Sequence, residues 1–405
     1  MELINEHEIN LIIKQFGLTK PLEWHTEEFS EKVIGYLGDH LKLIVQAENE
    51  GEKSELKLFV KCMPRFDKWK SEYVKDLKFF YKEFIMLSQL FPQFQNGDGS
   101  EIWRPKLLFI REDLFVFEDV SQLGYKMPYS RETMTFSTLK ATVKSVARFH
   151  AQSLIYEENK SKELGTPYRI WDDYSEYLQE PVKGQVWRNI GRNAVIDYIK
   201  EFSNAKSNPG FIEKVENIIP VLYDRAMALT RPSTKYRNVV THRDLWSNNI
   251  LIKEKENDDP HVLLIDFQTV LFSSPMLDLS SLIYFNTTRE DRDRFSSELI
   301  NIYHDTLSLI LHEAGVNVNT VFPKDTVTQA YDDSRIFGII QASIIVPIVC
   351  MSREKREEIF WDPIKSEKAN VVSRSEEFIE IAKEDPIYHN RFNDLLEEIV
   401  ERYIK

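Results

Sequence analysis

The sequence predicts an α+β chain in two lobes: a small β-rich N-terminal lobe over residues 1–119 and a large helical C-terminal lobe over residues 120–405. Three observations support this prediction. The chain has 405 residues and 42% hydrophobic content, more than one core of usual size requires. Short apolar runs with strand character precede residue 119, whereas long stretches with helical periodicity follow it. Charged residues, 29% of the chain, are spread evenly, so we expect no long disordered tail.

The N-terminal lobe is predicted to contain a sheet followed by a helix. We expect three strands between residues 33 and 64, with turns at 35–40 and 49–51 and strand character at 41–45 and 56–61. The segment 68–90 contains neither Gly nor Pro and places apolar residues at helical spacing, namely Tyr73, Leu77, Phe80, Phe84 and Leu87. A further strand at 114–117 ends in Glu118 and Asp119, where we place the lobe boundary.

The C-terminal lobe is predicted to be mainly helical. Helical periodicity occurs at 137–156, 193–202, 210–229, 291–314, 326–350 and 390–403. A short β element interrupts these helices, with strands at 249–253 and 262–265 divided by a polar turn. The candidate catalytic and metal-binding residues lie at this β element.

The composition argues against several classes of protein. A net charge of −13 is unsuited to a nucleic-acid-binding surface, which needs a basic face. Cys62 and Cys350 are far apart, so neither a disulfide framework nor a zinc site is expected. The N-terminus is acidic where a secretory signal is basic, and the longest apolar stretch, 336–351, is too short for a membrane span. We expect a cytoplasmic protein without membrane insertion or an obligate protein partner.

Two motifs around the β element indicate phosphoryl transfer. Asp244 and Asn249, within the segment 242–249, have the spacing of a kinase catalytic loop, in which Asp accepts the substrate proton and Asn binds metal. The apolar strand that follows ends abruptly in Asp266, and a carboxylate there is costly to bury unless it is paired or holds a metal. Either motif alone is equally consistent with a turn Asp. Both in this order favour an ATP- and Mg²⁺-dependent enzyme.

The N-terminal lobe should then supply a lysine for the phosphates and a glutamate to orient it. Lys61 ends the third strand, and Glu83 and Glu72 both lie on the helix that follows. We favour Glu83 because it shares a helix face with apolar residues that point inward.

Two further segments are candidates for nucleotide contacts. Gly35 and Gly38 could cover the phosphates, although Gly-x-x-Gly equally fits an ordinary hairpin turn. The linker residues Glu118 and Val120 could offer backbone groups to adenine.

Two features favour a small-molecule kinase over a protein kinase. The interval between Asp119 and Asp244 is long and reads as several helices, enough to build a closed acceptor pocket. After Asp266 the chain has Gln268 where protein kinases have Gly, no Ala-Pro-Glu, and only a short path to a helix near Asp278, so a long activation segment has no room.

On these residues the chain resembles the insect ecdysteroid kinase-like family, a CHK kinase-like group related to choline and aminoglycoside kinases. The matching segments are 58–61 with Pro64, 117–120 with Gly124, 147–151, 241–249, and 264–268 with Pro275 and Asp278. The resemblance implies a two-lobed protein-kinase-like fold of the aminoglycoside phosphotransferase and choline kinase type. It also implies ATP- and Mg²⁺-dependent phosphorylation of a hydroxyl on a small lipophilic alcohol, such as an ecdysteroid or a xenobiotic.

Carried over by position, Lys61 and Glu83 form the phosphate-orienting pair, Asp244 is the base, and Asn249 and Asp266 bind metal. The chain departs from the family in two places. Arg243 stands where relatives usually have Gly, and the turn that ends in Gly38 is not followed by a small polar residue.

Several residues admit more than one role. His150 is expected to be a packed helical histidine with one hydrogen bond, and His242 to brace the catalytic loop. Asp278 is expected to cap the next helix or to tie the loop down. Trp246 could line the acceptor site or pack between lobes, and Arg243 could be a salt-bridge partner only.

Two alternative functions remain open on the sequence. A choline-like or aminoglycoside-like acceptor would need an aromatic cage with acids, which the segment 171–174, Trp-Asp-Asp-Tyr, could supply. A catalytically silent protein that binds a hydrophobic ligand would retain the fold without turnover.

Overall fold

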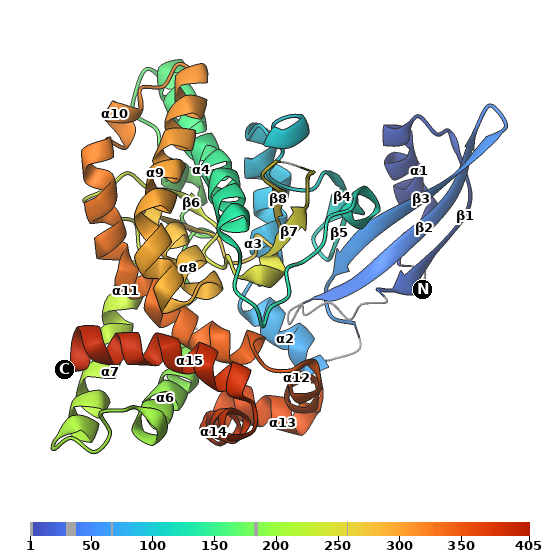
Figure 1. Cartoon of the computed structure of the whole chain (residues 1–405). Coiled ribbons are helices and arrows are strands. Elements are labelled where there is room, and N and C mark those ends of the chain that lie inside the picture. The colour runs from blue at the N-terminus through green and yellow to red at the C-terminus, as the bar shows by residue number, and fades with distance from the viewer. Residues whose placement is uncertain (1–2, 30–37, 66–67, 182–184, 257) are drawn as a thin grey trace. The chain divides into compact units, whose positions relative to one another are not determined.

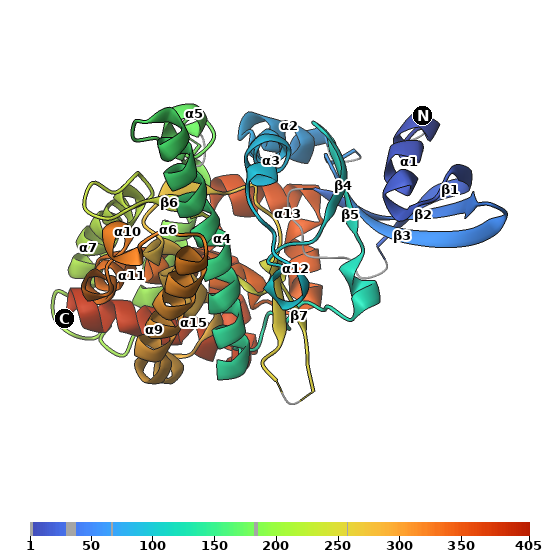
Figure 2. The same ribbon diagram turned by 90° about the horizontal axis from the view of Figure 1, so that it is seen from above.

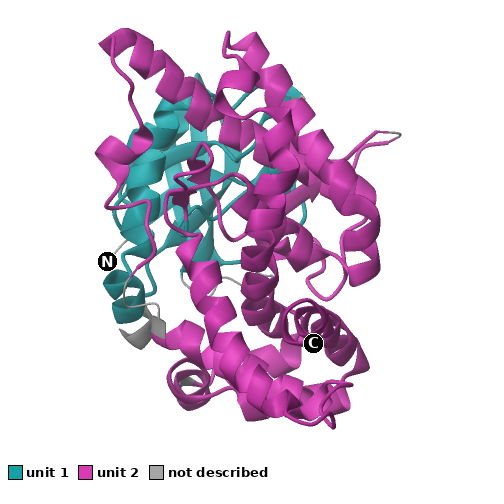
Figure 3. Cartoon of the chain, turned by 90° about the vertical axis from the view of Figure 1, so that its left-hand side faces the viewer, with its two compact units in different colours: residues 1–126, 263–269 teal, residues 127–262, 270–405 magenta. Residues whose placement is uncertain are grey.

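The computed structural model describes residues 3–29, 38–65, 68–181, 185–256 and 258–405 (Figure 1). Contacts divide the chain into two compact units (Figure 3): unit 1 comprises residues 1–126 and 263–269, and unit 2 comprises 127–262 and 270–405. The sequence placed a boundary after residue 119. The contact division falls after residue 126 and assigns the segment that carries Asp266 to unit 1.

Unit 1 is built on a five-stranded antiparallel sheet in the order β1-β2-β3-β5-β4. The strands are β1 (Lys20–Glu28), β2 (Asp39–Asn49), β3 (Glu52–Cys62), β4 (Leu107–Arg111) and β5 (Leu114–Glu118). Alternate residues of β2 are buried, as expected for a strand with one face on a core. Glu50 and Gly51, both with positive φ, form the tight turn between β2 and β3.

Helix α1 (Glu6–Ile13) covers one part of this sheet (Figure 1). A capping box between Asn5 and Glu8 begins the helix, and Ile9, Ile12 and Ile13 are buried in a core shared with β2, β3 and β4. The sequence analysis missed both α1 and β1. Strand β1 carries mainly charged and polar residues because it is the exposed edge of the sheet, so it lacks the apolar alternation of a half-buried strand.

The predicted helix 68–90 is divided in the structure. Helix α2 (Lys68–Asp76) ends before Lys78, which has a left-handed backbone with φ 55°, and helix α3 (Phe79–Ile85) begins immediately after it. A π-helical turn, Met86–Leu90, continues α3. Unit 1 also contains 3₁₀ turns at Lys14–Phe16, Phe91–Gln93, Gly99–Glu101 and Val120–Leu123. The break at Lys78 gives α3 a direction of its own, which sets the position of Glu83.

Unit 2 is helical apart from short strands. Its longer helices are α4 (Phe136–Leu164), α6 (Gln185–Phe202), α7 (Phe211–Ala228), α8 (Met276–Asn286), α9 (Arg289–Glu313), α11 (Lys324–Val349), α14 (Ser375–Glu384) and α15 (Pro386–Ile399). The shorter ones are α5 (Ile170–Tyr174), α10 (Val318–Val321), α12 (Arg353–Phe360) and α13 (Pro363–Glu367). The short strands are β6 (Val239–Thr241), β7 (Ile250–Lys253), β8 (His261–Leu264) and β9 (Leu271–Ser273), paired as β6-β9 and β7-β8. The last two residues of β8 belong to unit 1.

Helix α8 is the centre of unit 2, since all of its residues are buried. It packs on α11, while α4 runs beside α9 (Figures 1 and 2). A Cβ at Gly338 of α11 would lie 2.7 Å from the backbone of Ser280, so glycine is what permits α8 and α11 to approach so closely. The α+β class predicted from the sequence, with a β-rich N-terminal part and a large helical remainder, is confirmed.

Candidate active site

Lys61 lies near the end of β3 with only 6% of the residue exposed. Its Nζ donates hydrogen bonds to Oε2 of Glu83, at 2.5 Å, and to Oδ1 of Asp266, at 2.8 Å. Glu83 comes from α3 and Asp266 from the segment that follows β8, so three parts of unit 1 meet at one ammonium group. The structure brings together three residues that the sequence selected separately, and it pairs Lys61 with Glu83 while Glu72 is exposed.

The charge state of Lys61 follows from these contacts. Burial lowers the pKa of its ammonium group, but the charges and hydrogen bonds of Asp266 and Glu83 outweigh burial and raise the pKa to about 12. Burial raises the pKa of the Glu83 carboxyl. Lys61 is therefore a cation at neutral pH, held against two carboxyl groups.

Local packing explains why Glu83 reaches Lys61. After the break at Lys78, Phe80 stacks on Phe115 of β5 with ring centroids 4.4 Å apart, which seats α3 on the sheet. Glu83 is 1% exposed, and its second oxygen, Oε1, accepts a hydrogen bond from the backbone N–H of Phe267 at 3.0 Å. Glu83 thus holds both the lysine and the segment that carries Asp266.

The segment around Asp266 is held in unit 1 by aromatic packing. Phe267 makes edge-to-face contacts with Phe91 and Trp103, and the N–H of Leu264 donates to the carbonyl of Trp103 at 2.7 Å. Asp266 has φ 68°, a left-handed conformation that L-residues rarely adopt. Strain of this kind is retained where the surroundings over-determine the backbone, and it is common at functional sites.

The glycine turn is only partly described. A Cβ at Gly38 would lie 3.3 Å from the carbonyl oxygen of Cys62 and 3.6 Å from Cγ of Lys61, so a side chain there would press on the lysine strand. Gly35 lies outside the described residues. The phosphate contacts expected of this turn stay a prediction.

The linker residues make backbone contacts of their own. The N–H of Glu118 donates to the carbonyl of Lys106 at 3.0 Å, and the carbonyl of Val120 accepts from the N–H of Tyr125 at 3.2 Å. Asp119 caps the short 3₁₀ helix that begins at Val120. Adenine contacts from this linker stay a prediction.

In unit 2, the loop after β6 holds Asp244 by its side chain. The Asn249 Nδ2 donates to the Asp244 carbonyl oxygen at 2.8 Å and to its Oδ2 at 3.2 Å, and the Trp246 indole N–H donates to the same Oδ2 at 3.1 Å. Two donors on one oxygen fix the orientation of the carboxylate. Trp246, for which the sequence allowed two roles, therefore also holds the predicted base.

A buried carboxylate anchors the backbone of this loop. Asp278, at the start of α8 and fully buried, accepts the N–H of His242 on Oδ2 and the N–H of Arg243 on Oδ1, both at 2.6 Å. Its Oδ2 also accepts from His150 Nε2 at 3.0 Å, and the Tyr303 hydroxyl lies 2.9 Å from His150 Nδ1. Because the carboxylate only accepts hydrogen bonds, Nε2 of His150 carries a proton.

His150 therefore makes two hydrogen bonds, whereas the sequence analysis expected one. Of the two roles expected for Asp278, a helix cap or an anchor for the loop, the structure shows the anchor. The sequence analysis did not select Tyr303. Its position on a helical face gives no sign of the histidine, which is 153 residues away in the chain.

Arg243 has a backbone conformation that favours glycine. Its φ is 73°, a conformation that glycine adopts without cost and other residues do not. Its guanidinium lies 2.6 Å from Glu180, which also contacts Arg188. Arg243 thus connects the loop to the segment between α5 and α6, a link through Glu180 that sequence spacing could not reveal.

The acids proposed for a cation cage have other partners. Asp172 accepts the N–H of Arg169 at 2.9 Å, as part of the start of α5, and Asp173 accepts the Tyr168 hydroxyl at 2.9 Å. Trp171 stacks on Phe272 of β9 with centroids 6.1 Å apart. The segment is built as a packed helical turn.

The donor types suit Mg²⁺, which prefers oxygen ligands, usually one or two carboxylates together with substrate phosphates. Asp266 offers a partly exposed carboxylate, and Asn249, whose amide nitrogen donates to Asp244, has an amide oxygen of the type that Mg²⁺ prefers. Within the described ranges, no group of three or more His, Cys, Asp and Glu side chains could hold a metal ion. By donor type, each of these two residues suits a metal that needs few protein ligands.

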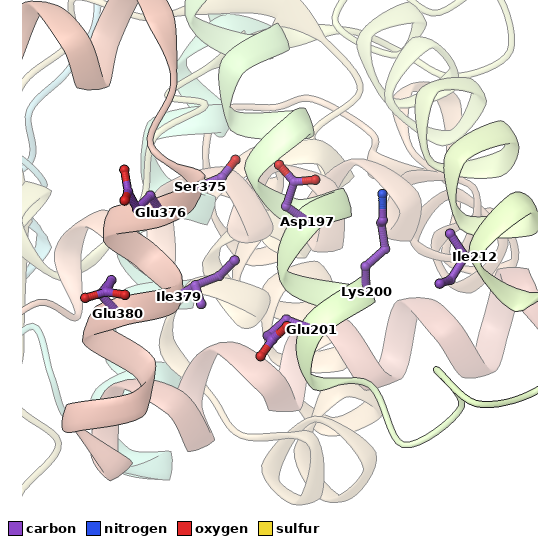
Figure 4. Close-up of a pocket in the computed structure, with 8 residues that line it drawn as sticks. All are labelled: Asp197, Lys200, Glu201, Ile212, Ser375, Glu376, Ile379 and Glu380. Atoms are coloured by element: carbon purple, nitrogen blue, oxygen red, sulfur yellow. The ribbon is translucent and has the colours of Figure 1, made fainter.

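Unit 2 also has an open hollow of about 560 Å³, lined by residues of α6, α7 and α14 (Figure 4). Asp197, Glu201, Glu376 and Glu380 contribute carboxylates to it, and Ile212 and Ile379 contribute apolar side chains. None of the predicted site residues lines it. Among the described helices, no single one is long and apolar enough to cross a membrane; α11 and α12 satisfy that test only as a pair bent by 95°.

Comparisons with known proteins place the chain in a family. No curated protein matches it. Among solved structures it is similar to the ethanolamine kinase of Plasmodium vivax, with 11% identity, a TM-score of 0.42, and coverage of 96% of this chain and 86% of that one. It is also similar to a choline kinase from Streptococcus pneumoniae, with 12% identity, a TM-score of 0.42, and coverage of 98% and 99%.

A third similar structure is the GDP complex of aminoglycoside 2'-phosphotransferase-IIIa, with 12% identity, a TM-score of 0.40, and coverage of 96% and 98%. The sequence model of the ecdysteroid kinase-like family matches residues 34–316, well over half of the chain. The chain therefore belongs to the ecdysteroid kinase-like family.

Proposed function

We propose that this protein is a small-molecule kinase that uses ATP and Mg²⁺ to phosphorylate a hydroxyl group. The observation that carries the proposal is the buried cluster of unit 1, in which Lys61 is held between Glu83 and Asp266. A surface lysine would not need two carboxylates, whereas a lysine that binds nucleotide phosphates must be charged and held in one place. Family membership supports the same class of enzyme.

Each predicted site residue has a part in the proposed reaction. Lys61 binds phosphate oxygens, Glu83 keeps its ammonium group in place, and the backbone at Gly35 and Gly38 covers the phosphates. The linker at Glu118 and Val120 receives adenine through backbone groups. Asp266 and Asn249 hold Mg²⁺, which neutralises charge on the transferred phosphoryl group when it is bound.

Asp244 accepts the proton in the proposed reaction. The acceptor hydroxyl oxygen forms a bond to the γ-phosphorus while the bond between that phosphorus and the bridging oxygen of ADP breaks, and ADP leaves with the electron pair. The hydroxyl proton passes to Asp244, whose carboxylate Asn249 and Trp246 orient. Apart from this proton transfer, the protein contributes by positioning the reacting groups and by stabilising their charge.

The proposed acceptor is a lipophilic alcohol, such as an ecdysteroid or a xenobiotic. The family assignment supports this class. A cationic acceptor needs uncommitted acids beside aromatic rings, and the hydrogen bonds of Asp172 and Asp173 within the segment 168–173 argue against that role for them.

An acceptor panel tests the proposal. Purified protein, with Asp266→Asn as the control, would be incubated with γ-labelled ATP, Mg²⁺ and separate steroids, phenolic glycosides, choline and an aminoglycoside. We expect label on the steroid or phenolic acceptors and none with Asp266→Asn. If only choline or the aminoglycoside is labelled, the acceptor is a cationic amino alcohol or aminoglycoside and not a lipophilic alcohol. If a ligand binds but no acceptor is labelled, the result favours a catalytically silent protein.

A further inference from the structure

Gln268 is a buried polar residue beside the Lys61, Glu83 and Asp266 cluster of unit 1, and it has no role in the proposed reaction. It is 6% exposed, and its Nε2 donates to Oδ2 of Asp266 at 3.0 Å. Lys61 donates to the other oxygen of the same carboxylate. Asp266 is therefore held from two sides by side chains of unit 1.

The orientation of the Gln268 amide follows from its partner. A carboxylate can only accept hydrogen bonds, so the amide nitrogen must face Asp266 and the amide oxygen must point elsewhere. That oxygen, Oε1, is buried, and among the described residues nothing donates a hydrogen bond to it. Buried carboxamide oxygens in native proteins nearly always have a partner, so a bound group is expected to supply one here.

The surrounding charge indicates the kind of group. One ammonium, on Lys61, faces the carboxyl groups of Glu83 and Asp266, so an additional cation is better tolerated than an anion. A neutral amide oxygen next to a carboxylate is a donor set that suits Mg²⁺, which keeps several of its own waters. A polar residue that holds a ligating carboxylate also tunes metal affinity.

We infer that Gln268 completes the magnesium site, with its amide nitrogen orienting Asp266 and its amide oxygen binding the ion or one of its waters. This inference rests on the proposed function, because it concerns the metal that Asp266 holds. Because the glutamine amide is neutral, the site has one negative charge fewer than it would have with a glutamate at this position.

Metal binding without turnover tests the inference. The concentration of free Mn²⁺, a paramagnetic substitute for Mg²⁺, is measured by electron spin resonance with protein and ADP present. Gln268→Met keeps the length of the side chain but removes both polar atoms, and we expect about tenfold weaker Mn²⁺ binding. Gln268→Glu adds a carboxylate, and we expect tighter binding than in the unchanged protein.

The matched control is Gln46→Met. Gln46, on β2, also donates its amide to a carboxylate, that of Glu55 at 2.5 Å, but the bond is exposed. We expect unchanged Mn²⁺ binding in this variant. In steady-state kinetics, Gln268→Met should raise the Mg²⁺ concentration needed for half-maximal rate by about tenfold, with a smaller change in kcat at saturating Mg²⁺.

The outcomes separate this inference from the proposed function. If the unchanged protein with ADP binds no Mn²⁺, the proposed function itself fails. If it binds Mn²⁺ and a folded Gln268→Met binds it equally well, Gln268 is a structural residue only and the inference is overturned. Should Gln268→Met not fold, Gln268→Glu decides, since unchanged affinity in that variant also overturns the inference.

Discussion

The two parts of the predicted site are held in place in different ways. In unit 1, Lys61, Glu83 and Asp266 hold one another through their own charged side chains. In unit 2, Asn249 and Trp246 orient the Asp244 carboxylate. The backbone N–H groups of the same loop donate hydrogen bonds to a separate buried carboxylate, that of Asp278. In unit 1 the proposed functional residues thus support one another, whereas in unit 2 the supporting residue, Asp278, is distinct from the proposed base, Asp244.

This difference teaches where function and stability can be separated. A change at a residue that both supports and acts, such as Glu83, alters the charge of the site directly. In unit 2, we expect a change at Asp244 to remove the proposed base and leave the anchor of the loop. We expect a change at Asp278 to remove the anchor and leave the proposed base. Variants in the two units should therefore show different combinations of lost activity and lost stability.

The largest effect is expected for Asp244→Asn. An amide cannot accept the hydroxyl proton, so kcat should fall by roughly 10² to 10⁴-fold. Asparagine still accepts the hydrogen bonds of Trp246 and Asn249, so the urea midpoint should stay near that of the unchanged protein. Asp333→Asn, at a carboxylate bound by Lys235 and Tyr236, is the control and should keep full activity. Equal activity of both variants would rule out Asp244 as the base.

Asp278→Asn is expected to affect stability first. Its carboxylate accepts two backbone N–H groups and His150, and an amide nitrogen in the same place would face a donor instead. We expect the free energy of unfolding to fall by about 3 kcal/mol, measured by urea denaturation.

Asp362→Asn provides the matched control for Asp278→Asn. Asp362 also accepts two backbone N–H groups, but it is exposed at the start of α13, where asparagine caps equally well. A change within about 0.5 kcal/mol is expected there. A similarly small change at Asp278 would mean that the loop does not depend on this anchor.

Glu83→Gln should change the pH dependence of activity. Glu83 and Asp266 raise the pKa of Lys61 to about 12 against the effect of burial. Without the Glu83 charge, that pKa falls, so Lys61 loses its proton and its hold on phosphate as pH rises through a lower value. The alkaline limb of the rate profile should move to lower pH, and the rate at neutral pH should fall about tenfold.

Glu72→Gln is the control for this pH experiment, because Glu72 is exposed on α2. Its profile should match that of the unchanged protein. If the alkaline limb were the same in both variants, Lys61 would not be the group that titrates there.

The smallest effect is expected at Arg243. Both Arg243→Gly and Arg243→Ala remove the contact with Glu180, but only glycine adopts φ 73° without strain. The glycine variant should therefore be more stable than the alanine variant by about 1 kcal/mol in urea denaturation. Equal stability of the two would show that this backbone is not strained.

Local sequence signals found most of the elements that carry the site. Strands β2, β3 and β5 and helices α4, α6, α7, α9, α11 and α15 were expected from sequence patterns near their positions in the structure, whereas α14 was not. Polar strand β1 and the break at Lys78 were not, because an exposed edge lacks apolar alternation and a single left-handed lysine leaves no trace in a helical pattern. Because the break was not foreseen, Glu83 could be preferred to Glu72 as the partner of Lys61 only from the face of the helix on which each residue lies.

The sequence by itself determined which residues are candidates for the proposed chemistry, because the spacing of Asp244 and Asn249 and the strand that ends in Asp266 are local patterns. The tertiary structure decided which residues meet. Lys61 and Asp266 are 205 residues apart, and Asp278 reaches His242 and His150 from another helix. Such partners depend on how helices and strands pack, and on which buried donors need acceptors, so no pattern within a few residues can specify them.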